Sequence, residues 1–216
     1  MELQPTYRYR ITFAKTEAMR FTGHLDLHRA WERTFRRADL PLAYDHGFTP
    51  HPRIQLGCAL PLGFVGDGEL MDAWLERPVA PDQMLSQLRG SAPPGILVHQ
   101  VEAVSGAEPS LQQQVVEAEY EVDLMQGSPQ AELGLRLAEL LAHESLPRVR
   151  RGKPYDLRPL IVSAEAAFPQ AAGPRLRLRL SARESATGRP DEVLAALGVD
   201  PSLADIRRTR LYLATS

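Results

Sequence analysis

Residues 7–13 alternate strictly between two faces, and this pattern most constrains the fold of the N-terminal half. One face of an extended chain would carry Tyr7, Tyr9, Ile11 and Phe13. Such alternation is typical of a strand with one buried face. Residues 25–38 then carry apolar side chains at helical spacing, and Leu40-Pro41 ends the predicted helix. A strand that leads into an amphipathic helix predicts an α+β protein.

The elements that follow extend this start into a β-α-β-β-α-β order. They are strands over residues 54–60 and 69–75, a short helix over 81–88 and a strand over 96–104. This order is the ferredoxin-like, or split βαβ, plan.

The second half of the chain repeats that order. The predicted elements are a strand over 120–124, a helix that opens at Ser128-Pro129 and runs to about 143, strands over 160–166 and 175–180, a helix over 190–197 and a strand over 206–213. We therefore predict an α+β fold formed by tandem duplication of a ferredoxin-like unit. Residues 1–105 would form the first unit, 117–216 the second, and 106–116 a polar linker.

The composition predicts a globular, cytoplasmic protein without a membrane anchor. Apolar residues make up 44% of the chain and charged residues 24%. No apolar run approaches the roughly 20 residues that cross a bilayer, and residues 1–15 lack the features of a signal peptide. Cys58 is the only cysteine, so it forms no internal disulfide and cannot alone hold zinc or an iron–sulfur cluster.

The net charge of −2 does not predict nucleic-acid binding, but arginines recur along strand faces. They lie in three groups: Arg175, Arg177 and Arg179; Arg208 and Arg210; Arg8 and Arg10. A basic sheet face is typical of an RNA-binding platform. In a ferredoxin-like sheet, however, the strand with Glu121 and Asp123 lies beside Arg175, so cross-strand ion pairs are the favoured interpretation.

The first candidate site is the His-Pro loop, residues 44–53, which contains His46, His51 and Arg53. Its glycine and prolines restrict the backbone, and a rigid loop on the surface can hold functional side chains in fixed positions. Imidazoles transfer protons near neutral pH or bind metal ions. The alternative is a rigid connector whose histidines are solvated or bonded to the backbone.

A second candidate lies where the first strand leads into the first helix. Backbone N–H groups at a helix start attract anions, and Arg20 and His24 would add donors there. Asp26 has an ordinary stabilising role in the first helical turn. His24 and His28 have the i, i+4 spacing of metal-binding helices, but without a definite third ligand we predict no metal site.

A third candidate is the basic loop at residues 151–159, which occupies the same place in the second unit. Lys153 and Arg158 would bind phosphate. The alternative is an exposed basic turn in which Asp156 bonds a neighbouring arginine.

Several motifs together resemble the radical SAM-linked family, a bacterial domain of unknown function fused to, or encoded beside, a radical SAM protein. They are residues 20–27, 32–38, 40–42, 47–54, 60–63 and 69–72, with Asp156-Leu157-Arg158-Pro159 as the second motif. Family members commonly have serine where this chain has Gly23, which puts a hydroxyl role there in doubt. The chain lacks the Cys-x3-Cys-x2-Cys motif, so the resemblance implies that S-adenosylmethionine and the iron–sulfur cluster are bound by a partner and not by this chain.

The resemblance also implies a role near RNA, because family genes often lie beside a ribonuclease of the E/G type and ribosomal-protein genes. The first hypothesis is a non-catalytic accessory or substrate-binding protein that works with a radical SAM protein in tRNA or rRNA modification or processing. The residues expected to bind phosphate or the partner are Arg20, His24, Asp26, His51, Arg53, Lys153, Asp156 and Arg158. The second hypothesis is a metal-independent RNA-processing endonuclease in which His46 or His51 is the general acid or base. The third is a structural or interaction protein.

Overall fold

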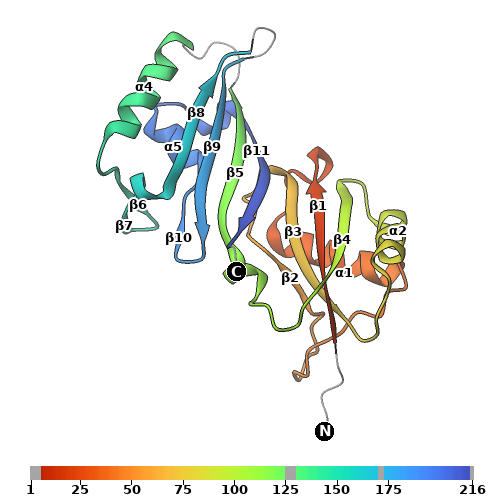
Figure 1. Ribbon diagram of the computed structural model, residues 1–216. Helices are drawn as coiled ribbons and strands as arrows, with labels where there is room; N and C mark the ends of the chain where they lie inside the picture. Colours follow the sequence, from red (N-terminus) through yellow and green to blue (C-terminus); the bar gives the residue numbers. More distant parts are fainter. Residues whose placement is uncertain (1–5, 125–129, 170–172, 215–216) are drawn as a thin grey trace. The chain divides into compact units, whose positions relative to one another are not determined.

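The computed structural model describes residues 6–124, 130–169 and 173–214, which divide into two compact units, Met1–Gln114 and Val115–Ser216 (Figure 1). The described residues form five α-helices and antiparallel sheets, a mixed α/β structure. None of these helices combines the length and the apolar character that a membrane crossing needs. The predicted helix start at Ser128-Pro129 lies outside the described residues.

Unit 1 contains a four-stranded sheet in the order β2-β3-β1-β4, with every neighbouring pair antiparallel. Its elements are β1 (Tyr7–Lys15), the 3-10 turn η1 (Glu17–Met19), α1 (His24–Arg37), β2 (Ile54–Leu56), β3 (Val65–Leu75), α2 (Pro81–Ser91), β4 (Ile96–Val104) and α3 (Leu111–Gln114). The predicted β-α-β-β-α-β order of elements is therefore present through β4.

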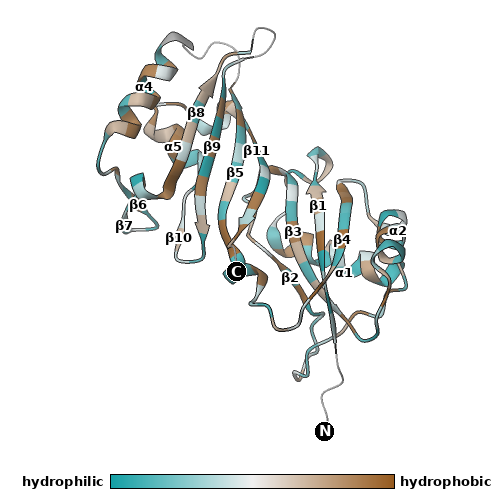
Figure 2. Ribbon diagram, viewed as in Figure 1, coloured by the Kyte–Doolittle hydropathy of each residue, from teal (hydrophilic) through white to brown (hydrophobic). Residues whose placement is uncertain are grey.

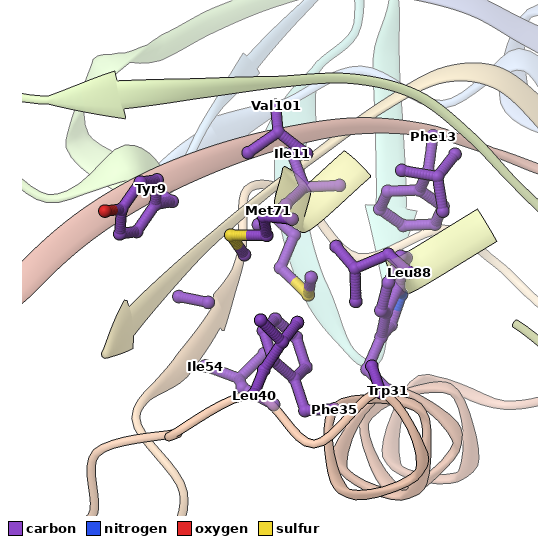
Figure 3. Close-up of a cluster of buried hydrophobic side chains, with 14 of the residues drawn as sticks. Tyr9, Ile11, Phe13, Trp31, Phe35, Leu40, Ile54, Met71, Leu88 and Val101 are labelled. Carbon is purple, nitrogen blue, oxygen red and sulfur yellow. The ribbon is translucent and has the colours of Figure 1, made fainter. Parts of the chain in front are cut away.

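The core of unit 1 lies between one face of this sheet and the helices α1 and α2. Ile11 and Phe13 point from β1 into this core, as their alternation predicts, and meet Trp31 and Phe35 from the apolar stripe of α1 (Figure 3). The Phe13 and Trp31 rings pack edge to face with centroids 4.9 Å apart. Tyr7, predicted on the same face, is 38% exposed at the strand end.

The opposite face of the unit 1 sheet buries a charged cluster. Asp72 of β3 is fully buried and accepts hydrogen bonds from Arg8 Nε (2.8 Å) and Arg10 Nε (2.9 Å). Arg8 also donates to the carbonyl oxygens of Glu108 and Pro109, both at 2.8 Å. Arg8 and Arg10 share a strand face, as the sequence predicts, and their partner on that face is Asp72.

The segment that covers this cluster was predicted as a polar linker. Instead, residues 105–114 pack on unit 1, with Leu111 of α3 fully buried. Gln114 Oε1 accepts from Arg10 (3.1 Å), and the Leu111 N–H donates to Gln55 of β2 (3.1 Å). We call residues 105–114 the strap, because its carbonyls and side chains complete the hydrogen bonds of the buried arginines.

Unit 2 contains strands in the order β8-β9-β5-β11, again antiparallel, with β10 also paired to β9. Its elements are β5 (Val115–Leu124), α4 (Gln130–Ala142), β6 (Pro147–Arg150), β7 (Lys153–Asp156), η2 (Arg158–Leu160), β8 (Ile161–Ala167), β9 (Arg175–Arg183), β10 (Ala186–Thr187), α5 (Pro190–Ala196), η3 (Pro201–Leu203) and β11 (Ala204–Leu213). The strands β6 and β7 form a separate hairpin, and α4 and α5 lie on one side of the larger sheet (Figure 1).

The arginines of β9 are paired with carboxylates of β5, as the sequence predicts. Arg175 lies 3.2 Å from Glu121 and also contacts Asp123, while Arg179 contacts Glu117. Leucines alternate with these arginines along β9 and are buried on the other face of the sheet. In Figure 2 this alternation is visible as brown and teal bands along β9. The basic ladder is therefore half of an ion-pair ladder.

The prediction that Arg208 and Arg210 share a face of β11 is wrong. The register with β5 shifts between these two residues, so Arg208 is fully buried and Arg210 is exposed. An added residue in one strand of a pair moves the following side chains to the other face.

Two predicted strand boundaries differ from the structure. β2 ends before Gly57, whose close neighbours are Leu111 and the Leu70 carbonyl oxygen, 3.2 Å and 3.3 Å from where a Cβ atom would lie. β3 begins at Val65 and includes Gly66 and Gly68, for which the sequence predicts a turn. A Cβ atom at Gly66 would lie 2.9 Å from Cγ of Glu69, so a side chain there would require Glu69 to move.

The buried cluster gives a stability prediction. Replacing Asp72 by alanine leaves two guanidinium groups buried without their shared carboxylate, which we expect to lower the free energy of unfolding by about 3–5 kcal/mol. Urea denaturation followed by circular dichroism measures this loss. Glu32→Ala is the control, because it removes an exposed pair with Arg36 on α1 worth about 0.5 kcal/mol. Should Asp72→Ala not fold, Asp72→Asn keeps the shape and removes the charge. A loss below about 1 kcal/mol in both variants contradicts the assigned role.

Candidate functional site

The His-Pro loop is fixed from inside by one carboxylate. Asp45 Oδ1 accepts hydrogen bonds from the backbone N–H groups of His51 (3.0 Å) and Gly47 (3.3 Å), and the Asp45 N–H donates to the His51 carbonyl oxygen (2.9 Å). An isolated bridge between Tyr44 and Pro52 closes the base. The His51 amide, followed by the Gly47 amide, holds the pKa of Asp45 below its usual value, since both donors stabilise the charged carboxylate.

The side chains that point outward from this loop are His46, Phe48 and His51, all exposed. Arg53 instead turns back to the sheet. Its Nη1 donates to Thr6 Oγ1 (3.0 Å), and its guanidinium lies 4.9 Å from the Trp74 ring centroid. Sequence reasoning missed Phe48, although an aromatic residue at the centre of a polar Gly/Pro loop is itself a signal.

The Arg20 motif lies at the other end of β1 and is joined to the loop before β3. Arg20 Nε donates to the Gly63 carbonyl oxygen (2.8 Å), and the Gly63 N–H donates back to the Arg20 carbonyl oxygen (3.1 Å). The buried Lys15 amine donates to the carbonyl oxygens of Arg20 and Phe64, both at 3.1 Å. The predicted phosphate ligand Arg20 therefore locks two loops together.

These locked loops and the first turn of α1 carry exposed apolar side chains. We define the apolar end patch as Phe21, Leu25 and Leu62, whose exposures are 77%, 72% and 63%. Phe21 lies beside Gly63, where an added Cβ atom would be 3.9 Å from its ring. His24 is exposed at the start of α1, and Asp26 pairs with Arg29 on the helix surface at 3.2 Å.

The sequence-predicted residues of unit 1 therefore form two sites. Arg53 lies beside Thr6, where β1 begins, whereas Arg20 follows the end of β1. Nine extended residues separate the two ends by roughly 30 Å. His28 Nε2 lies 3.3 Å from the Ile54 carbonyl oxygen, and His24 and His28 have no third metal ligand within the part of the chain that the structure describes.

In unit 2 the predicted basic loop is a hairpin, residues 147–156, which we call the basic hairpin. Its turn residues Arg151 and Gly152 both have positive φ, 50° and 78°, as a two-residue type I′ turn requires. Arg151 and Lys153 are exposed and form no ion pair with any residue that the structure describes. These two cations are therefore available to an anionic partner.

Asp156 and Arg158 hold the base of the basic hairpin. Asp156 Oδ1 accepts from the N–H groups of Leu146 (2.7 Å) and Arg158 (2.9 Å). The predicted alternative paired Asp156 with an arginine side chain, whereas these two partners are backbone groups. Chiefly the Leu146 amide holds the Asp156 pKa below its usual value. Arg158 Nε donates to the Leu141 carbonyl oxygen at the end of α4 (3.1 Å), a stabilising place for a cation.

A second set of contacts ties the basic hairpin to α5. Arg150 Nε donates to Glu192 Oε1 (2.7 Å), and the Tyr155 hydroxyl also donates to Glu192. The Arg150 guanidinium lies 4.9 Å from the Tyr155 ring centroid. Burial, followed by the Glu192 hydrogen bond, raises the pKa of Tyr155 to about 12. Glu192 has a lowered pKa because the bonds from Arg150 and Tyr155 outweigh its own burial.

A groove of about 410 Å³ lies in unit 2 beside this hairpin. Leu140, Leu146 and Leu197 contribute apolar surface to it. Its polar lining comes from Arg136, Glu139, His143 and Arg148. Arg136 and Arg148 in this lining can bind an anionic group, although Glu139 adds one negative charge beside them. Sequence reasoning missed the groove because its walls come from three separate segments.

The Tyr155 contact predicts a titration. Tyr155 should ionise near pH 12. Burial, the largest cause of this raised pKa, remains in Glu192→Gln, so that variant should lower the pKa only in part, through loss of the neighbouring negative charge. Since the folded state holds the phenol proton more tightly, the stability from this contact is complete below pH 10 and is lost as the pH rises through about 12. Ultraviolet difference titration against Tyr155→Phe isolates this tyrosine. A Tyr155 pKa of 10 in the native protein contradicts the contact.

The comparison with curated proteins found no match. The model of a family described as an uncharacterized protein conserved in bacteria (DUF2344) matches residues 8–190. The match therefore runs from β1 to the start of α5 and includes the His-Pro loop, the apolar end patch and the basic hairpin. The chain belongs to this bacterial family, DUF2344.

Proposed function

We propose that the chain is a non-catalytic accessory protein that binds RNA and a separate radical SAM protein. The observation that carries the proposal is the separation of two surfaces at opposite ends of β1. One end presents the apolar end patch, and the other presents the polar His-Pro loop. An adaptor needs two surfaces of different chemistry, each on a fixed support.

The apolar end patch fits a protein partner. Three large apolar side chains exposed at one end of a unit are typical of a protein interaction surface. Their loops are held by Arg20 and Lys15, so a partner would meet a preformed surface with little entropy to lose. The resemblance of the surrounding motifs to the radical SAM-linked family supports a radical SAM protein as the occupant.

The His-Pro loop and the basic hairpin fit RNA. His46 and His51 are hydrogen-bonding groups on a fixed loop, and Arg151 and Lys153 supply two exposed cations. Phosphate contacts by lysine and arginine provide most sequence-independent affinity for nucleic acids. Asp45, the acid beside the two imidazoles, is occupied by backbone N–H groups. This supports a binding role over a nuclease role.

We also propose that the chain arose by duplication of a ferredoxin-like unit. The strand order β2-β3-β1-β4 has the counterpart β8-β9-β5-β11. In addition, an aspartate that accepts two backbone N–H bonds precedes the second strand of each unit, Asp45 before β2 and Asp156 before β8.

The RNA role predicts a salt-dependent affinity. The affinity for single-stranded RNA should fall steeply between about 50 and 200 mM salt, because each phosphate contact adds about −0.7 to the slope of log K against log salt. Arg151→Ala/Lys153→Ala should reduce that slope by about 1.4. Fluorescence anisotropy measures both quantities, with Arg33→Ala/Arg36→Ala on α1 as the matched control. Binding that ignores salt, or an equal effect of both double variants, contradicts the role of the basic hairpin.

The partner role predicts co-purification. The tagged chain, expressed in its native host, should retain a radical SAM protein, and Phe21→Ser/Leu62→Ser should lose that protein while remaining folded. Leu135→Ser, which changes an exposed leucine on α4, is the control and should keep the partner. Retention by the double variant refutes the assigned surface. Cleavage of RNA in EDTA that disappears in His51→Ala would instead favour the endonuclease.

A further inference from the structure

Phe48 has the most exposed large apolar side chain in the described part of the chain, with a relative accessibility of 107%. It contributes nothing to the core. The loop that carries it is nonetheless ordered by the Asp45 hydrogen bonds and by the bridge at its base. A fixed loop that holds an aromatic ring in water has prepared that ring for a contact outside the unit.

The surroundings of Phe48 indicate what kind of contact this is. Its neighbours along the loop are His46, Gly47, Thr49 and His51, with Pro50 the only other apolar residue between the imidazoles. An aromatic anchor for a protein pocket normally lies among further apolar side chains. In unit 1 such a grouping exists at the apolar end patch, about a strand length away. Phe48 lies among the hydrogen-bonding groups of the loop, whose other exposed aromatic residue is Tyr44 at 40%. Aromatic rings among hydrogen-bonding groups are typical of sites that stack on unpaired nucleobases.

The loop also holds the groups that a stacked nucleotide needs. Asp45 turns the backbone of the loop by accepting from the N–H groups of His51 and Gly47, and the His46 and His51 side chains are both exposed on that loop. The imidazoles can donate to phosphate or ribose oxygens next to a base that lies on Phe48. Arg53, bound to Thr6 and Trp74, supports the base of the loop.

We propose that Phe48 stacks on an unpaired base of single-stranded RNA, with His46 and His51 contacting the adjacent backbone. The assignment rests on the proposed RNA-binding function and narrows its substrate class to unpaired segments. In a base-paired helix the faces of the bases are covered by their neighbours, so Phe48 would have no base to stack on.

Three substitutions at Phe48 test the contact. Phe48→Ala should weaken binding of a short single-stranded RNA by about five- to 150-fold. Phe48→Leu should lose nearly as much, because it keeps apolar area without a ring face. Phe48→Trp should keep the affinity, and its added fluorescence should be quenched by RNA relative to the native protein. Phe168→Ala is the matched control, an exposed phenylalanine of unit 2 outside the proposed binding surfaces that should bind RNA normally.

The outcomes separate this proposal from the function on which it rests. If the native protein binds single-stranded RNA and Phe48→Ala binds it equally well, stacking is overturned while RNA binding stands. Native affinity in Phe48→Leu also overturns stacking, because it shows that burial of apolar area at position 48 is sufficient for binding. If the native protein binds no RNA, both the function and the stacking contact fail. The proposal is supported if Phe48→Ala and Phe48→Leu both lose affinity for single-stranded RNA while their binding of the same sequence in double-stranded form is unchanged.

Discussion

The buried pairing of Asp72 with Arg8 and Arg10 is the interaction on which unit 1 depends. A carboxylate without water requires partners that replace its hydration, and here two guanidiniums of β1 provide them. Those guanidiniums in turn need further acceptors, which the strap supplies. One buried carboxylate thus fixes the pairing of β1 with β3 and the path of the chain after β4.

The same cluster supports the His-Pro loop. The Arg8 guanidinium lies 5.4 Å from the centroid of the Trp74 ring, and Arg53 lies 4.9 Å from the same ring. Asp72, Arg8, Trp74 and Arg53 therefore form a continuous set of contacts from the buried face to the loop. A loop supported in this way can keep polar and aromatic groups in water without losing its shape, which is why exposure and order coexist at Phe48.

Much of the fold follows from periodicity in the sequence. The alternation at residues 7–13 and the stripe that contains Trp31 predict the core correctly, because burial on one face leaves a period that can be read directly. Alternation does not say what covers the other face. The strap was therefore predicted as a linker, since its one acid and three glutamines are polar side chains, although its carbonyl oxygens bind arginines. The register shift between Arg208 and Arg210 likewise cannot be predicted from the alternation of side chains in the sequence.

The positions of the two candidate loops could be predicted from the sequence, but the role of each side chain in them could not. Prolines, glycines and charged residues identified both loops, since these residue types concentrate where the chain turns. Which side chain faces outward depends on the hydrogen bonds of the backbone, and these are not local in sequence. Asp45 and Asp156 accept hydrogen bonds from backbone N–H groups. The Arg158 guanidinium donates to a backbone carbonyl oxygen.

The geometry of a short loop prevents many of its backbone N–H groups from reaching the loop's own carbonyl oxygens. One aspartate carboxylate can accept hydrogen bonds from two of these N–H groups. The side chains that remain free to meet a partner are then those without a bonding role in the loop. In the His-Pro loop they are the imidazoles and Phe48, and in the basic hairpin Arg151 and Lys153. His51 anchors its loop through backbone groups alone, so the contact side chains can change while the loop keeps its shape.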